Sequence, residues 1–298
     1  MTRVANAPCS WGAFEFGGDT STTWERVLDE MAATGYAGTE LGDWGFLPTD
    51  PGRLREELDR RGLELLGAFV PAALWRVECH DWALETALRA ARLLADVSRD
   101  APVIVLSDDN ASVPRRAERA GRIGPDDGLD DAQWERFAQG AMRLARSVRE
   151  QTGLRTVFHP HCGGYVEAPW EIDTLMERTD PEVLGLCLDT GHITLGGGLP
   201  EEVFGRYAGR VWHVHFKDCA PDVADRGRSE GWDYVRAVRE GVFCELGRGS
   251  VDFRRVLDAL LQTQFRGWIV VEQDVLPGLG SPAESAVRNR TYLRRLGL

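Results

Sequence analysis

The sequence lacks several features that would assign a chain to a class directly. It has no run of 18 or more apolar residues, which excludes an ordinary transmembrane helix. Its N-terminus carries no apolar signal core, so we expect a cytoplasmic protein. None of its six cysteines forms a CxxC pair, which excludes zinc knuckles and thioredoxin-type motifs and predicts reduced thiols. Residues 6–12, at the end of the first predicted strand, lack the G-x-G-x-x-G string of dinucleotide-binding open sheets.

Positive charge is also scarce in this chain. Lysine and arginine number 35 against 47 aspartate and glutamate residues, which leaves a formal net charge of -12. Such a chain repels phosphate backbones, and we therefore expect no nucleic-acid partner and no membrane partner. The hydrophobic fraction of 43% and the charged fraction of 28% are ordinary for a globular protein. A length of 298 residues suits one α/β barrel with insertions.

Short apolar runs alternate with helical patterns along the whole chain. Eight strands are predicted, at residues 4–10, 36–41, 63–70, 102–107, 155–161, 183–189, 211–217 and 267–273. Helical spacing is clear at residues 23–34, 82–97 and 131–152. We expect helix N-caps at Thr23, Asp131 and Asp252 and helix ends at Gly35, Gly62 and Gly153. This alternation predicts a closed (β/α)₈ TIM barrel in a single domain, residues 1–298, rather than a doubly wound open sheet.

Polar insertions follow two of the predicted strands. Residues 108–130 form one, and residues 219–232 and 242–251, within the span 219–251, form the other. Loops after barrel strands rise above the catalytic face, so these segments are either lids over a pocket or plain surface loops.

Histidines gather at the ends of predicted strands. The chain has six histidines, and five of them (His159, His161, His192, His213 and His215) lie at or just past the ends of strands five, six and seven. Carboxylates occupy similar places, with Glu40, Asp189 and Glu272 at the ends of strands two, six and eight. Strand ends of a barrel form one rim around one pocket, so these side chains should meet in space.

This pattern predicts a metal site. We predict His159, Asp189, His215 and Glu272 as ligands, one from each of strands five to eight, because a lone buried carboxylate needs a positive partner. Mixed imidazole and carboxylate ligands suit Mn²⁺, Co²⁺, Fe²⁺ or Zn²⁺ better than Ca²⁺. The alternative for each residue is an ordinary hydrogen-bonded core or ion-pair role.

Other polar residues are assigned less directly. His161, Lys217, Glu40 and His192 are predicted catalytic groups, because each follows or ends a predicted strand beside the metal ligands. His213 lies one step deeper than His215 on the same face and is expected to be a structural hydrogen-bonding residue. Predicted substrate contacts come from three more residues, Trp11, Glu167 and Arg248. Core packing, a helix-dipole partner and a surface charge are the respective alternatives.

Several strings resemble inosose dehydratases, which belong to the xylose-isomerase-like TIM-barrel superfamily. They are Val-Phe-His-Pro-His-Cys-Gly-Gly-Tyr-Val-Glu at 157–167, Leu-Asp-Thr-Gly-His at 188–192, His-Val-His-Phe-Lys-Asp at 213–218, Gly-Arg-Gly-Ser-Val-Asp-Phe at 247–253 and Val-Glu-Gln-Asp at 271–274. The resemblance implies one divalent metal, usually Mn²⁺ or Co²⁺, with Asp189, His215 and Glu272 at the shared ligand positions. Zn²⁺, Fe²⁺ and Mg²⁺ are the other metals considered. The related sugar epimerases have Glu where this chain has His159.

The expected function follows from this site and this resemblance. We expect a metal-dependent dehydratase of a keto-inositol, acting on a small polyhydroxylated carbonyl compound by α-proton abstraction through an enediolate. An isomerase or epimerase of an inosose or ketose, and a lyase of another carbonyl sugar, share the first step. An apurinic endonuclease would need a basic groove, and a sugar-binding protein without activity would have no need of the ligands. The sequence allows a homo-oligomer.

Overall fold

Nine short parallel strands form the centre of the protein, described here from a computed structural model that covers residues 3–13, 22–110, 112–276 and 278–298. The strands are β1 (Arg3–Asn6), β2 (Gly38–Thr39), β3 (Glu64–Leu65), β4 (Gly67–Pro71), β5 (Val103–Ser107), β6 (Arg155–Phe158), β7 (Leu184–Asp189), β8 (Val211–Phe216) and β11 (Trp268–Val271). Their order in the sheet is β3-β2-β1-β11-β8-β7-β6-β5-β4. Neighbours along this sheet follow one another in the chain, apart from β1 and β11, its first and last strands; β9 and β10, between β8 and β11, form a separate sheet.

The barrel closes through the third predicted strand, which the structure divides into β3 and β4 at Leu66. The Leu66 N–H donates to the Thr39 carbonyl at 2.9 Å, and the Leu66 carbonyl accepts from the Val103 N–H at 2.9 Å. One chain segment therefore pairs with β2 on one side and β5 on the other. The predicted (β/α)₈ barrel is confirmed, with β3 and β4 as two parts of one strand position.

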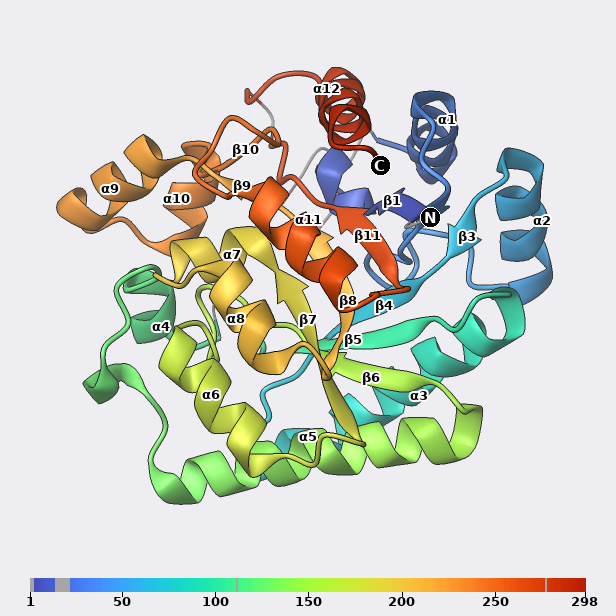
Figure 1. Cartoon of the computed structure of the whole chain (residues 1–298). Coiled ribbons are helices and arrows are strands. Elements are labelled where there is room, and N and C mark those ends of the chain that lie inside the picture. The colour runs from blue at the N-terminus through green and yellow to red at the C-terminus, as the bar shows by residue number, and fades with distance from the viewer. Residues whose placement is uncertain (1–2, 14–21, 111, 277) are drawn as a thin grey trace.

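Helices surround the barrel (Figure 1). They are α1 (Trp24–Thr34), α2 (Pro51–Arg61), α3 (His80–Val97), α4 (Pro114–Glu118), α5 (Asp131–Thr152), α6 (Pro169–Arg178), α7 (Thr190–Leu195), α8 (Pro200–Tyr207), α9 (Pro221–Glu230), α10 (Tyr234–Arg239), α11 (Phe253–Gln262) and α12 (Pro282–Arg295). Their buried faces carry residues at helical spacing, such as Val27, Leu28 and Met31 of α1. Within the described residues, no helix is both long enough and apolar enough to cross a membrane.

Most predicted helix boundaries match the structure. Thr23 and Asp252 are N-caps whose side chains accept an N–H three residues on, and Gly35, Gly62 and Gly153 end their helices with positive φ. The predicted N-cap at Asp131 is wrong by one residue. Asp130 is the N-cap, because its carboxylate accepts the Gln133 N–H at 2.7 Å while the Gln133 side chain accepts the Asp130 N–H at 2.8 Å.

Several predicted strands are shorter than expected: those predicted at 155–161 and 267–273 are Arg155–Phe158 and Trp268–Val271, and the first two strands differ most. The first, predicted at 4–10, ends at Asn6, and Pro8–Trp11 forms a 3-10 turn. Proline has no N–H to donate to a sheet, which explains why this strand stops there. Only Gly38–Thr39 of the predicted second strand, 36–41, pairs as a strand. Both segments still carry their following side chains to the same rim of the barrel.

Both predicted insertions contain ordered structure of their own. After β8, the strands β9 (Asp218–Cys219) and β10 (Phe243–Cys244) pair antiparallel and enclose α9 and α10. The buried Asp218 carboxylate holds this excursion by accepting the N–H groups of Gly247, Gly249 and Val251. In the segment 108–130, the buried Arg116 guanidinium pairs with the Glu171 carboxylate of α6 at 2.8 Å. A lid role for either segment stays a prediction.

Candidate metal and active site

The four predicted metal ligands converge at one end of the barrel. His159 follows β6, Asp189 ends β7, His215 lies on β8 and Glu272 follows β11, and these four strands are neighbours in the sheet. One donor atom from each residue lies within 4.8 Å of the donor atoms of the other three. All four side chains are buried, with Glu272 the most exposed at 8%. Residues 113 positions apart in the chain thus form one cluster, as strand ends of a barrel should.

The contacts inside this cluster fit a bound cation. The His215 Nδ1 lies 3.2 Å from the Glu272 Oε1 and 3.7 Å from the Asp189 Oδ2, yet it makes no hydrogen bond to any described residue. The nitrogen of His159 that faces this cluster is Nε2, which lies 3.4 Å from the Asp189 Oδ2. Buried nitrogens beside carboxylates are normally hydrogen-bonded, and a divalent ion held by His215, Asp189 and Glu272 would satisfy the His215 Nδ1.

Glu40 orients the imidazole of His215. Its Oε1 accepts hydrogen bonds from the Nε2 of His213 at 2.6 Å and from the Nε2 of His215 at 3.0 Å. A proton on the His215 Nε2 leaves the lone pair on Nδ1, which faces Asp189 and Glu272. Burial raises the pKa of the Glu40 carboxyl, but His215 and His213 outweigh it and hold that pKa at about 2. Glu40 is thus a charged partner behind a predicted metal ligand as well as part of the cavity wall.

Lys217 is the only lysine in the chain. Its Nζ lies 3.1 Å from the Glu272 Oε2 and 3.4 Å from the Asp274 Oδ2, and it lies 4.7 Å from the centre of the Phe243 ring. Burial lowers the pKa of this amine, but Asp274 and Glu272 outweigh burial and hold the pKa well above its usual value. The group is therefore an ammonium held against the cluster by two carboxylates.

Two neutral imidazoles form the neighbouring wall of the site. The rings of His161 and His192 lie 3.8 Å apart. The His161 Nδ1 donates to the Cys162 carbonyl at 2.8 Å, which leaves the Nε2 lone pair facing the Tyr234 hydroxyl at 3.4 Å. Burial, together with nearby His159 and Lys217, lowers the pKa of His161 well below its usual value. Burial and the facing His161 do the same to the pKa of His192.

A cavity of about 680 Å³, including its mouth, opens over this cluster, and this volume is typical of small-molecule sites. Five predicted site residues line it: Glu40, His159, His161, Lys217 and Glu272. Asp189, His192 and His215 lie directly behind this wall, in contact with the residues that line it.

The structure does not bring the three predicted substrate-binding residues to the described wall of this cavity. Trp11 is buried and donates its indole N–H to Glu30 at 2.6 Å. Glu167 is buried and accepts the N–H groups of Gly121 and Gly163. Arg248 is exposed and pairs with Glu245 at 3.2 Å. Direct substrate contact by these three residues has no geometric support, because each side chain already has a structural partner elsewhere.

Several residues that line the cavity were not predicted from the sequence. Asp274 lies two positions after Glu272, so strand alternation was a signal that could have placed it beside the ligands. Asn110 belongs to the polar segment after β5, and Tyr234 belongs to the excursion after β8. Neither carries a sequence signal, because nothing in a polar loop marks which side chain turns inward. Asn110 is 9% exposed, and neither amide atom has a hydrogen-bond partner among the described residues.

Comparison with known proteins identifies the same type of barrel. The family model of the xylose isomerase-like TIM barrel matches residues 28–296. An inosose dehydratase of Geobacillus kaustophilus is 35% identical over 296 residues, which cover 99% of this chain and 94% of that protein.

Two solved structures show the same fold at low identity. The probable 3-DHS dehydratase AsbF of Bacillus anthracis has a TM-score of 0.72 at 14% identity and covers 99% of both chains. The 3-keto-D-glucoside 4-epimerase of E. coli has a TM-score of 0.69 at 14% identity, covering 99% of this chain and 100% of that chain. The sequence match and the fold together place this chain in the xylose isomerase-like TIM barrel family, as an inosose dehydratase-like member.

Proposed function

We propose that this protein is a divalent-metal-dependent hydro-lyase that removes water from a keto-inositol. The observation that carries the proposal is the buried cluster of His159, Asp189, His215 and Glu272 at the floor of a cavity, in a chain 35% identical to an inosose dehydratase. These four residues would hold a divalent ion, which would supply a Lewis acid for the substrate carbonyl and for the negative charge that develops when the α-proton leaves. The two imidazoles and two carboxylates suit Mn²⁺ or Co²⁺, which we propose as the resident metal.

The proton transfers fall to residues of the cavity wall. The Nε2 of His161 is the base that removes the α-proton of the substrate, because this nitrogen carries a lone pair and faces Tyr234 in the cavity. The ammonium of Lys217 is the acid for the departing hydroxyl, because it is the one charged donor held beside Glu272 among the described residues of the wall. The amide of Asn110, which has no hydrogen-bond partner among the described residues, is available for a substrate hydroxyl.

An isomerase or epimerase of a keto-sugar is the second candidate, since the first proton transfer is the same. The imidazole at position 159 favours dehydration over epimerisation. Epimerisation needs two acid/base groups on opposite faces of the substrate, and in this chain the position where the related epimerases have a carboxylate is a histidine. Oligomeric state and a cytoplasmic location stay expectations from the sequence.

Product analysis separates the two candidates. The purified protein with Mn²⁺ or Co²⁺ is incubated with scyllo-inosose, and the ultraviolet absorbance and product mass are followed. Dehydration yields a conjugated product that has lost one water. An isomer of unchanged mass without new absorbance would favour the second candidate, and no turnover with any inosose or ketose would contradict both.

A further inference from the structure

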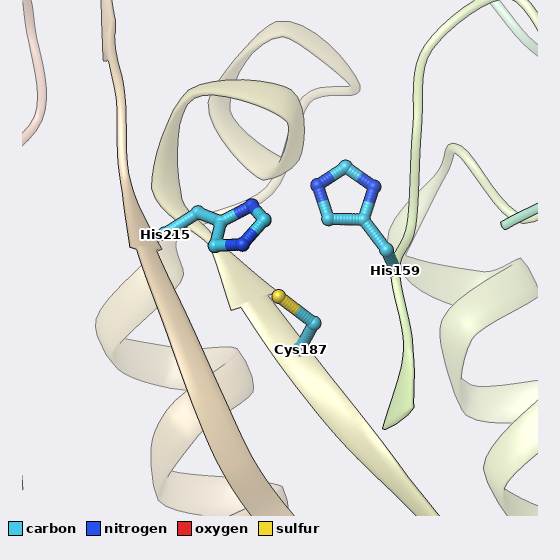
Figure 2. Close-up of side chains that lie close together, drawn as sticks. All are labelled: His159, Cys187 and His215. Carbon is cyan, nitrogen blue, oxygen red and sulfur yellow. The ribbon is translucent and has the colours of Figure 1, made fainter. Parts of the chain in front are cut away.

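A thiol lies beside the two histidines of the proposed metal site. Figure 2 shows the sulfur of Cys187 between the rings of His159 and His215, and the sulfur and one nitrogen from each ring lie within 4.8 Å of one another. Cys187 and Asp189 belong to β7 and are two residues apart, so their side chains point to the same face of the strand. Asp189 is nearer the end of the strand. Cys187 is therefore one step deeper in the barrel.

The surroundings of Cys187 differ from those of the carboxylates. The thiol is completely buried and packs in a cluster with Val103, Val105 and Val157. The imidazoles of His159 and His215 thus have oxygen donors on the side of the mouth, from Asp189 and Glu272. On the side of the apolar interior they have the sulfur of Cys187. The same pair of histidines can complete either set of donors.

From this arrangement we infer a second position for a metal ion, in which His159, Cys187 and His215 bind a thiophilic divalent cation such as Co²⁺, Zn²⁺ or Cd²⁺. This inference rests on the metal centre of the proposed function and adds a ligand to it. On binding, the Cys187 thiol loses its proton to solvent and coordinates as the thiolate.

Size and ligand type both support this position. Metal–sulfur and metal–nitrogen bonds of about 2.3 and 2.0 Å set ligand atoms roughly 3.3–3.8 Å apart around a tetrahedral ion. Gaps of up to 4.8 Å close by small side-chain rotations. Soft thiolate ligands favour Zn²⁺ and similar ions, whereas Mn²⁺ favours carboxylate oxygens. We therefore expect Mn²⁺ to use Asp189 and Glu272 without Cys187, and thiophilic ions to use Cys187.

Cobalt spectroscopy tests the inference without an activity measurement. The metal-free full-length protein is titrated with Co²⁺ under anaerobic conditions, and bound Co²⁺ is quantified alongside the absorption spectrum. We expect a near-ultraviolet charge-transfer band from thiolate to Co²⁺ that saturates at one ion per chain. The band should be absent from Cys187→Ser and present in the matched control Cys9→Ser, which removes the thiol that lines the cavity.

Each other outcome overturns the inference. Co²⁺ bound in wild type without the band, or a band that persists in Cys187→Ser, would exclude Cys187 as a ligand while leaving the proposed metal centre intact. Failure to bind any Co²⁺ would instead remove the metal centre on which the proposed function rests. Thermal unfolding of Cys187→Ser and of a second variant, Cys187→Ala, shows whether each still folds. Both Cys187 variants should bind Mn²⁺ as wild type does. Equal loss of Mn²⁺ would assign Cys187 a structural role instead.

Discussion

At the scale of single residues, Lys217 is the side chain whose chemistry is hardest to replace. The chain has 35 lysine and arginine residues, and Lys217 alone is lysine. The aliphatic part of the Lys217 side chain packs directly against Gly191. A Cβ atom added to Gly191 would lie only 2.6 Å from the Lys217 Cγ. A compact ammonium fits this space and can give up a proton, whereas a guanidinium is larger and stays protonated.

Lys217→Arg tests whether the site needs the amine or only its charge. We expect kcat to fall by roughly 100-fold or more, because the acid for the leaving hydroxyl is lost. Metal content and folding should be kept, which metal analysis and circular dichroism check. Arg143→Lys, an exchange at an exposed position, is the matched control and should behave as wild type. Wild-type kcat in Lys217→Arg would show that Lys217 contributes charge alone.

At the scale of elements, Asp108 joins the end of β5 to the loop after β6. Its Oδ2 accepts the Tyr165 N–H at 2.7 Å, and its buried Oδ1 has no hydrogen-bond partner among the described residues. Burial raises the pKa of this carboxyl to about 8, although the hydrogen bond from the Tyr165 N–H acts to lower that pKa. The folded protein therefore holds the Asp108 proton at neutral pH, while the unfolded chain releases it near its usual pKa of about 3.9.

This difference predicts how stability depends on pH. Because the folded-state pKa is raised, the stabilisation is complete below about pH 4 and is lost as the pH rises through about 8, at up to ~1.4 kcal/mol per pH unit. Asp108→Asn keeps an acceptor for Tyr165 without a titrating proton. Urea unfolding at pH 5, 7 and 9 should show a flatter profile in this variant, whereas the exposed control Asp126→Asn follows wild type. Parallel profiles for Asp108→Asn and wild type would contradict the assignment.

At the scale of the whole molecule, the site joins strands from both halves of the chain. Four carboxylates (Glu40, Asp189, Glu272 and Asp274) lie buried in one place, with Lys217 as the ammonium between two of them. A metal ion that binds only the folded barrel stabilises every strand that carries a ligand. The expected gain is about 2.7 kcal/mol at a free metal concentration 100 times Kd.

Metal removal should therefore lower Tm. We expect Mn²⁺ to raise the Tm of chelator-treated protein by roughly 5 °C, measured by differential scanning calorimetry. Asp189→Ala should abolish this shift, because it removes a ligand and leaves the barrel strand in place. Asp126→Asn should retain the shift in full. An equal shift in Asp189→Ala would mean that the stabilising ion binds elsewhere.

Much of this protein follows from local patterns in the chain. The period of the apolar runs predicts alternating strands and helices, and such alternation leaves a closed parallel barrel as the way to bury every strand. His159, Asp189, His215 and Glu272 could be grouped from the sequence, because each ends a strand and all strand ends of a barrel share one rim. Trp11, Glu167 and Arg248 have no such grouping, because loop side chains follow no strand period, and their predicted substrate contacts stay predictions.

By itself, then, the sequence determined the barrel and the four side chains gathered at its mouth, since strand periodicity and topology are enough to bring them together. Only the tertiary structure decided that Asn110 and Tyr234 turn into the cavity, that Glu40 holds His213 and His215, and that Cys187 lies beneath the histidines. Those contacts depend on how loops fold back and how side chains pack between distant segments, and no spacing along the chain encodes that packing.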